Sequence, residues 1–246
     1  MVLLFSENIL IVSCIAFVAL RFFIIERDRA EAALAREKER SEMLLLNILP
    51  PSIAERLKGE HLTLADGYAE VSILFADIVG FTKMSAIMSP ERLVEVLNKL
   101  FSRFDLLCEN YGVEKIKTIG DAYMVCAGLP EPRSDHAQAI ANLALAMQDA
   151  LVEHNQEFGS DLKIRIGINS GPVVAGVIGL KKFIYDLWGD AVNVASRMES
   201  TGVPNRIQVS TSTWKLLREY FDFEAPRTLD IKGLGATDAY LLTGRK

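Results

Sequence analysis

The pattern of hydrophobic and polar positions changes twice along the chain and divides it into three segments. Residues 1–25 are nearly all apolar, and residues 26–67 are rich in charged residues and helix formers. Residues 68–246 alternate short apolar runs, which favour buried strands, with apolar positions three and four apart, which favour amphipathic helices. This order predicts a membrane helix, a helical linker and one globular domain.

The first segment has the length of a membrane span, since about 20 apolar residues in a helix cross the hydrocarbon core of a bilayer. Glu7, Asn8 and Arg21 interrupt it, which suits the last span of a larger membrane domain, packed against other helices. A cleaved signal peptide is a weaker alternative, because the segment has no basic start. Basic residues follow the span, so the positive-inside rule places residues 26–246 in the cytoplasm. We therefore expect the protein in the cell membrane.

The second segment is expected to begin as one helix, because residues 26–49 contain neither glycine nor proline. Apolar residues occupy only part of the seam of a heptad repeat: Ala30, Leu34, Leu44 and Ile48, against the polar Glu37 and Ser41. This favours a weak parallel coiled coil between two chains, with a single solvated helix as the alternative. Pro50-Pro51 ends the helix, and a short amphipathic segment follows at 52–58.

Strand and helix signals alternate in the third segment. The expected elements are a buried strand at Val71–Ala76, a helix from Ser89-Pro90 to about Asn110 that ends at Gly112, a hairpin of Ile116–Ile119 and Ala122–Ala127 around Gly120-Asp121, a helix at about Asp135–Phe158, and a second hairpin of Ile164–Asn169 and Val173–Val177 around Ser170-Gly171-Pro172. This order predicts an α+β sandwich in which helices cover one face of an antiparallel sheet.

The charge of the chain narrows its range of partners. It has 27 basic and 32 acidic side chains and a net charge of −5. Domains that bind nucleic acids usually present a strongly basic surface. We therefore expect no nucleic-acid partner.

Two aspartates, Asp77 and Asp121, stand beside apolar strands. A carboxylate is costly to bury unless it is paired or binds a metal, and its oxygens suit Mg²⁺ and Mn²⁺. After Asp77 the chain turns, and backbone N–H groups there could cradle phosphate oxygens: Ile78, Gly80, Phe81 and Thr82. These features predict a nucleotide site with two divalent cations. The alternative is a pair of turn aspartates that bind their own backbone.

Two further spacings are informative. Lys117 lies four residues before Asp121, and even spacing on a strand puts both side chains on one face. Asn193 and Arg197 are also four apart, so they share one face of a helix. There they could donate to a ribose or to charge that develops on a phosphate. A solvated helix face is the alternative for this second pair.

Four ordered motifs resemble the catalytic domain of class III nucleotidyl cyclases, and the resemblance covers essentially all of residues 68–246. They are Phe75–Thr82, Lys117–Met124, Arg165–Gly171 and Tyr185–Met198. The segment Asn47–Pro51 also resembles the linker before this domain in many membrane-bound members. The resemblance implies a ferredoxin-like α+β fold that works as a head-to-tail dimer. A homodimer of this chain would build two equivalent sites.

The resemblance also implies a role for each motif residue. In the family, one chain supplies the metal-binding aspartates, and its partner supplies the residues that recognise the base, orient the ribose and stabilise the transition state. The matching residues are Asp77 and Asp121 for the metals, Arg165 for a phosphate, Lys117 and Asp186 for adenine, and Asn193 and Arg197 for the ribose and the transition state. Leu234 departs from the family, because many members have there a lysine that helps to hold the triphosphate.

Lys117 and Asp186 predict ATP as the substrate, because guanylate cyclases usually have Glu and Cys at these two places. The implied reaction is attack of the ribose 3′-hydroxyl on the α-phosphate, with two divalent cations, Mg²⁺ or Mn²⁺. It would release pyrophosphate and form 3′,5′-cyclic AMP for intracellular signalling. The alternatives are a guanylate or mixed cyclase, a non-catalytic nucleotide-binding module, and a membrane-anchored dimerisation scaffold.

Overall fold

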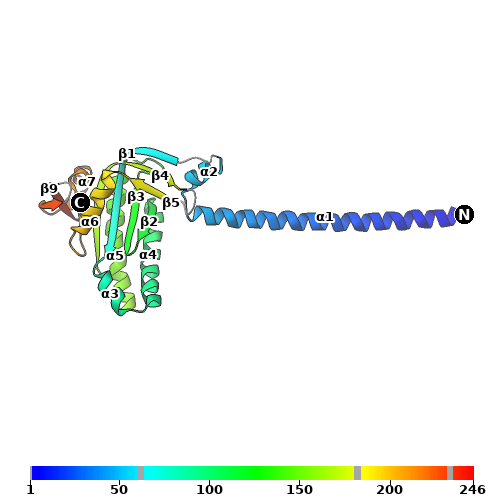
Figure 1. Cartoon of the computed structure of the whole chain (residues 1–246), viewed down its shortest axis with the longest axis horizontal. Helices are drawn as coiled ribbons and strands as arrows, with labels where there is room; N and C mark the ends of the chain where they lie inside the picture. Colours follow the sequence, from blue (N-terminus) through cyan, green and yellow to red (C-terminus); the bar gives the residue numbers. More distant parts are fainter. Residues whose placement is uncertain (1, 60–63, 180–183, 232–234) are drawn as a thin grey trace. The chain divides into compact units, whose positions relative to one another are not determined.

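The computed structural model describes residues 2–59, 64–179, 184–231 and 235–246, with side chains from residue 13 onwards. The chain divides into two compact units, Met1–Ala54 and Glu55–Lys246. Figure 1 shows the long helix of the first unit and the sheet of the second unit with its helices.

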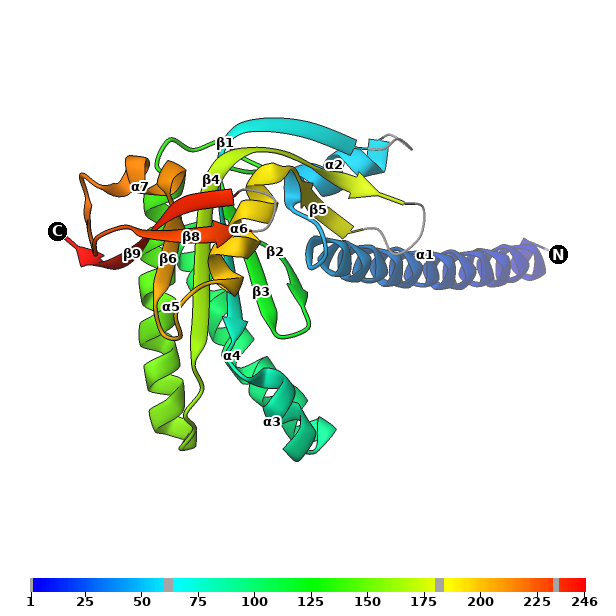
Figure 2. The ribbon, with the colours of Figure 1, turned by 60° about the vertical axis from the view of Figure 1, so that its left-hand side comes forward.

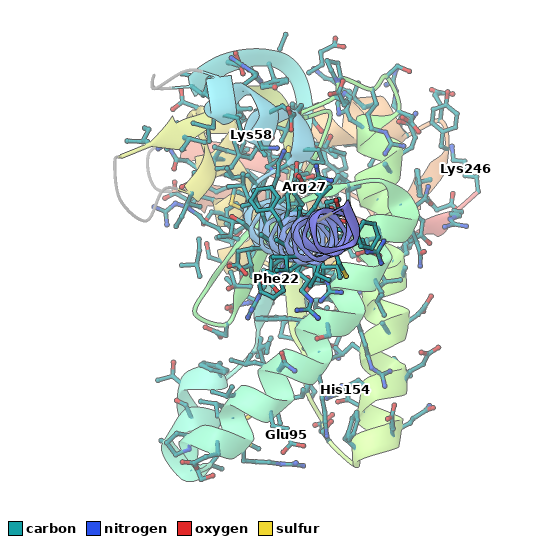
Figure 3. The ribbon with its side chains drawn as sticks, turned by 90° about the vertical axis from the view of Figure 1, so that its right-hand side faces the viewer. Phe22, Arg27, Lys58, Glu95, His154 and Lys246 are labelled. Atoms are coloured by element: carbon teal, nitrogen blue, oxygen red, sulfur yellow. The ribbon has the colours of Figure 1, made fainter. Side chains whose placement is uncertain are left out.

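The first unit is helical, and its boundary with the second unit falls within α2. Helix α1 (Val2–Leu46) continues through the predicted membrane segment and most of the predicted linker helix, and α2 (Pro51–Gly59) follows it. The break between them confirms that Pro50-Pro51 ends the first helix, since proline cannot continue one. Side chains along α1, such as Phe22 and Arg27, project away from the helix (Figure 3), and Leu34 is 72% exposed.

The membrane span and the two-chain coiled coil stay predictions. Residues 1–12 of the expected span lie outside the part of the chain whose side chains are described. Among the described residues, none of the helices is both sufficiently long and sufficiently hydrophobic to cross a membrane.

Within the described residues, the strands of the second unit form one nine-stranded sheet. The main path runs β2-β3-β1-β4-β6-β9-β7, while β5 pairs with β4 and β8 pairs with β9. The pairing of β4 with β6 is parallel, so the sheet is mixed rather than antiparallel as expected. The strand bounds are β1 Leu64–Ile78, β2 Glu114–Ile119, β3 Ala122–Ala127, β4 Ile164–Ile178, β5 Ile184–Trp188, β6 Ile207–Ser210, β7 Phe221–Phe223, β8 Arg227–Ile231 and β9 Gly235–Arg245.

The long strands β1 and β4 pair along most of their length at the centre of the sheet. The sequence predicted a hairpin at Ser170-Gly171-Pro172, but β4 continues through this segment, so that prediction is wrong. The register shifts here, because Ala69 and Glu70 of β1 lie opposite Pro172. A β-bulge interrupts the hydrogen-bond ladder and can therefore accommodate a proline, which has no N–H to donate.

Helices lie on both faces of the sheet, not on the single face that was expected. Helices α4 (Pro90–Tyr111) and α5 (His136–Phe158) form a core with Ile164, Ile166 and Ile168 of β4. Helix α6 (Asp190–Ser200) packs on the alternate residues of β4, on the other face. Figure 2 shows α6 beside β4. Two short helices, α3 (Phe81–Ile87) and α7 (Thr211–Leu217), also belong to this unit.

The structure confirms the predicted start and end of α4, and α5 covers nearly the predicted range. Ser89 caps α4, since its hydroxyl accepts a hydrogen bond from the backbone N–H of Arg92 at 3.3 Å. Gly112 ends α4 in the left-handed conformation, with φ of 59°. The hairpin of β2 and β3 is also confirmed, with Gly120 and Asp121 between the strands. These signals are local and need no tertiary context to be recognised.

Gly167 allows α6 to lie directly against β4. A methyl group at this position would stand 1.9 Å from the backbone nitrogen of Glu199 on α6, and 2.5 Å from its Cα. Backbone atoms of a packed helix cannot give way as a flexible side chain can. The close approach of helix and strand therefore depends on this glycine.

We expect Gly167→Ala to lower the free energy of unfolding by about 1–3 kcal/mol, the usual cost of overpacking a core. Urea unfolding of the purified variant measures this loss. Gly67→Ala on β1 is the matched control, because a methyl group there meets nothing within 4 Å. Equal losses in both variants would contradict the steric explanation.

Candidate active site

Asp77 and Arg165 meet on the face of the sheet that α6 covers. Asp77 lies near the end of β1, directly opposite Arg165 of β4 in the strand register. Nη2 of Arg165 donates a hydrogen bond to Oδ2 of Asp77 at 2.7 Å. Both side chains are mostly buried, so water and salt screen their charges only weakly.

Asp121 reaches the same place from the turn between β2 and β3. Gly120 supplies the left-handed conformation of this turn, with φ of 63°. Ala122, the residue after Asp121, pairs with Asp77. Burial raises the pKa of Asp121, and the negative charge of Asp77 raises it further. The structure thus brings the two predicted metal ligands together, at the cost of repulsion that a bound cation would relieve.

Glu199 joins this group from α6 and was not predicted from the sequence. Its Oε1 lies 3.1 Å from Nε of Arg165, in an ion pair whose atoms are not aligned for a hydrogen bond. Burial raises the pKa of Glu199 to about 7, and the charge of Asp77 adds to the effect. The hint in the sequence was Gly167, two residues after Arg165, which permits the approach of α6. We call Asp77, Asp121, Arg165 and Glu199 the acidic cluster.

The carboxylate oxygens of Asp77 and Asp121 suit divalent cations that are bound together with a nucleotide. Among the described residues, no group of three or more His, Cys, Asp or Glu side chains could hold a metal by itself. Mg²⁺, however, is commonly bound by one or two carboxylates together with water and the phosphates of the substrate. Arg165 already places a positive charge beside Asp77.

The turn after β1 contains the predicted phosphate-binding backbone. Ile78 still belongs to β1 and pairs with Ile164, whereas Gly80 is left-handed, with φ of 75°, and precedes α3. Phe81 and Thr82 lie in the first turn of α3, where backbone N–H groups have no partner within the helix. Their contact with a phosphate stays a prediction.

Lys117 and Asp186 form an ion pair between β2 and β5. Nζ of Lys117 donates to Oδ2 of Asp186, whose other oxygen accepts a hydrogen bond from the N–H of Leu187 at 2.8 Å. The spacing argument that placed Lys117 on one face with Asp121 is wrong. The chain reverses at Gly120, so even spacing along a single strand does not apply.

Helix α6 presents Asn193 and Arg197 to the solvent, whereas Ala191, Ala195 and Met198 are buried. In the part of the chain that the structure describes, neither exposed side chain forms a hydrogen bond or an ion pair with Asp77 or Asp121. Within one chain, the predicted site residues therefore stand in separate groups.

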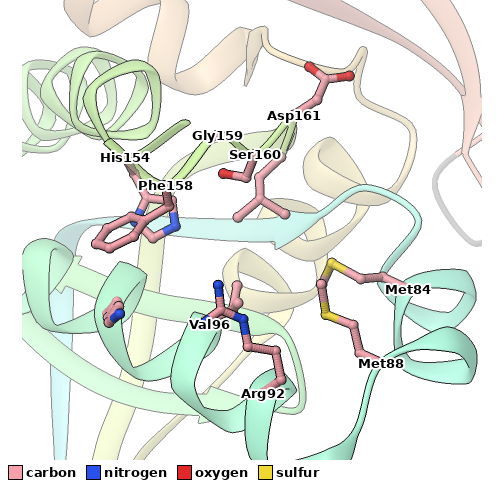
Figure 4. A pocket seen from close by; sticks show the side chains of 11 residues that line it. Met84, Met88, Arg92, Val96, His154, Phe158, Gly159, Ser160 and Asp161 are labelled. Carbon is pink, nitrogen blue, oxygen red and sulfur yellow. The ribbon is translucent and has the colours of Figure 1, made fainter. Parts of the chain in front are cut away.

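A cavity of about 350 Å³ lies apart from these groups, between α3, α4 and the turn from α5 to β4. Met84, Met88, Arg92 and Phe158 are among its lining residues (Figure 4). It contains none of the predicted site residues.

Leu234, the position that departs from the family pattern, lies outside the described residues.

Comparison with known proteins shows which family the chain resembles. Residues 64–244 match the family model described as the adenylate and guanylate cyclase catalytic domain. An adenylate cyclase of Mycobacterium tuberculosis is 46% identical over 233 residues, which are 94% of this chain and 53% of that protein. Retinal guanylyl cyclase 1 of Rattus norvegicus is 44% identical over 227 residues, which are 89% of this chain and 20% of that protein. The chain thus spans about half the length of the first relative and less of the second.

A solved structure has the same fold. The guanylate cyclase domain of RhGC from Catenaria anguillulae, in complex with GTP, superposes with a TM-score of 0.70 at 38% identity. The match covers 74% of this chain and 100% of that one. Members of the family bind a nucleotide substrate and work as dimers. The predicted class III cyclase domain is therefore confirmed, and the chain belongs to the family of adenylate and guanylate cyclase catalytic domains.

Proposed function

We propose that the chain is an adenylate cyclase, which converts ATP to 3′,5′-cyclic AMP and pyrophosphate at sites shared between two copies of the chain. The observation that carries the proposal is the contact between Lys117 and Asp186, the two side chains that would recognise the base. The identity of 46% with a mycobacterial adenylate cyclase is consistent with this activity.

Lys117 and Asp186 suit adenine on chemical grounds. The Asp186 carboxylate can accept a hydrogen bond from the exocyclic amino group of adenine, and the Lys117 ammonium can donate one to a ring nitrogen. Guanine presents a carbonyl oxygen and a ring N–H instead. Both side chains are mostly buried, and a buried polar group left without a partner costs about 1–3 kcal/mol. The pair therefore favours ATP over GTP.

Conversion of GTP is the second candidate function. A retinal guanylyl cyclase of the rat is 44% identical to the chain, so overall similarity alone separates the two substrates poorly. The residues at positions 117 and 186 separate them better, because in the proposed complex their hydrogen-bonding groups would contact the base directly.

Each group of side chains has a distinct task in the proposed reaction. The ribose 3′-hydroxyl attacks the α-phosphorus, and pyrophosphate leaves. Asn193 orients the ribose, and Arg197 stabilises the negative charge that develops on the phosphate. Arg165 binds the triphosphate, as a guanidinium can do with two parallel hydrogen bonds. When bound at Asp77 and Asp121, divalent cations would make the 3′-hydroxyl more acidic and neutralise the phosphates.

The exposed surface around Asp186 supports a site shared by two copies. Four apolar side chains of β4 and β5 are between 37% and 59% exposed: Val174, Ile178, Ile184 and Trp188. In the strand register, Val174 pairs with Trp188 and Ile178 pairs with Ile184, on either side of Asp186. Clustered exposed apolar residues commonly mark an interface. A second copy is the partner we propose, because each chain carries both sets of site residues.

The base-recognition proposal predicts that the purified chain cyclises ATP with a kcat/KM roughly 100-fold above that for GTP, since GTP would leave two buried groups unpaired. We expect Lys117→Glu combined with Asp186→Cys to reverse this preference. Lys115→Glu is the matched control, because Lys115 lies on the same strand but pairs with Asp105 at 2.7 Å. Steady-state kinetics with both nucleotides measure the ratio, and equal efficiencies in the wild-type chain would contradict the assignment.

The shared-site proposal predicts that Asp77→Asn and Arg197→Ala chains are each nearly inactive alone but restore activity when co-expressed. Random pairing would give roughly a quarter of the wild-type rate, because about half of the dimers are mixed and each has one intact site. Cyclic AMP formation measures the rescue. Asp77→Asn with Asp121→Asn is the control pair that should stay inactive, and an inactive first pair would argue against a shared site.

The interface proposal predicts that Trp188→Glu weakens dimerisation about 30-fold or more, since a buried aromatic at an interface often contributes about 2 kcal/mol or more. Sedimentation velocity over a range of protein concentrations measures the dissociation constant. Val152→Glu on α5 is the control, because Val152 is 54% exposed but lies on a helix outside the proposed interface strands. An unchanged dissociation constant for Trp188→Glu would remove this face from the interface.

A further inference from the structure

We propose that Glu199 is a positioning residue for Arg165 and serves the half of the site that binds metal and triphosphate. Glu199 lies on α6 only two residues from Arg197, but Arg197 serves the other half of the site, which binds the ribose and stabilises the transition state. This inference rests on the proposed function, in which each site combines the acidic cluster of one chain with Asn193 and Arg197 of its partner.

Arg165 is held at two points by two carboxylates. Glu199 contacts Nε, next to the aliphatic stem, at 3.1 Å, and Asp77 accepts from the outer nitrogen Nη2 at 2.7 Å. The two contacts are not equivalent. If Glu199 fixes the stem, the outer nitrogens can exchange Asp77 for a phosphate without moving the rest of the side chain. Asp77 is then free to bind a cation.

Glu199 is itself held in place by the packing of α6. Glu199 is only 8% exposed, and its backbone lies against Gly167 of β4. The neighbouring carbonyl of Met198 accepts a hydrogen bond from Nε2 of Gln208, a fully buried residue of β6, at 2.9 Å. The end of α6 is thus tied to the sheet, and the Glu199 carboxylate has a defined position beside Arg165.

The helical period explains how α6 can serve two sites. Residues two apart on an α-helix point about 200° apart around its axis, because each residue turns the helix by about 100°. Arg197 is accordingly exposed, whereas Glu199 is buried against the sheet. The exposed side of α6 would complete the site of the partner, and its buried side would order the site of its own chain.

Neutralising Glu199 should leave Arg165 with Asp77 as its remaining carboxylate. Arg165 would then compete more strongly with a cation for Asp77, and its stem would lack an anchor. We expect Glu199→Gln to weaken the binding of 3′-deoxy-ATP with Mg²⁺ about tenfold, a typical effect of losing one contact to a charged group. This nucleotide lacks the attacking hydroxyl, so calorimetry reports binding without turnover.

Co-expression then assigns Glu199 to one half of the site. We expect the Glu199→Gln chain to be rescued by the Arg197→Ala chain, which supplies an intact acidic cluster, and not by the Asp77→Asn chain. Rescue by Asp77→Asn instead would place Glu199 with Arg197 and overturn the proposal. Rescue by neither, or wild-type kinetics and nucleotide binding for Glu199→Gln alone, would overturn it too.

Four controls separate the possible failures. Glu153→Gln removes a carboxylate whose side chain is 74% exposed on α5 and should leave binding and activity unchanged. Thermal unfolding of Glu199→Gln tests whether the chain still folds, and Glu199→Asp, which restores the charge, should recover part of the lost nucleotide affinity. The pair of Asp77→Asn and Arg197→Ala reports on the shared site itself, so its failure would refute the proposed function rather than the role of Glu199.

Discussion

The antiparallel pairing of β1 with β4 is the constraint on which the rest of the site depends. It places Asp77 opposite Arg165 and directs both side chains to the face that α6 covers. Ile164, Ile166 and Ile168 alternate with these polar positions and point into the core with α4 and α5. A slip of one residue would exchange the two faces of the strand, burying Arg165 among apolar side chains. The apolar core therefore fixes the register that builds the acidic cluster.

The second requirement is the close approach of α6 to β4. Gly167 removes the side chain that would separate them, and Glu199 comes into contact with Arg165 as a result. Three carboxylates then lie near one guanidinium: Asp77 and Glu199 contact Arg165, and Asp121 lies close enough to be influenced by its charge. Such an excess of negative charge is costly without further cations, which is the electrostatic reason why this face of the sheet suits divalent metals and a triphosphate.

Features carried by a few neighbouring residues could be predicted from the sequence. The cap at Ser89, the end of α4 at Gly112 and the hairpin turn at Gly120-Asp121 agree with the structure because each depends on local backbone preferences. The false hairpin at Ser170-Gly171-Pro172 shows the limit of such preferences. Those residues favour a turn in isolation, but the bulge in β1 lets the strand continue through them.

The sequence by itself determined the family, the motif residues and the order of the main catalytic elements, because these follow from short motifs and local propensities. Only the tertiary structure decided which motif residues meet within one chain. The family resemblance had assigned Lys117 and Asp186 jointly to the base, but only the structure shows their direct contact across 69 residues. It also shows that Arg165 contacts Glu199, a residue outside all four motifs. Such contacts depend on strand register and on helix packing, and both are set by long-range burial that no short stretch of sequence contains.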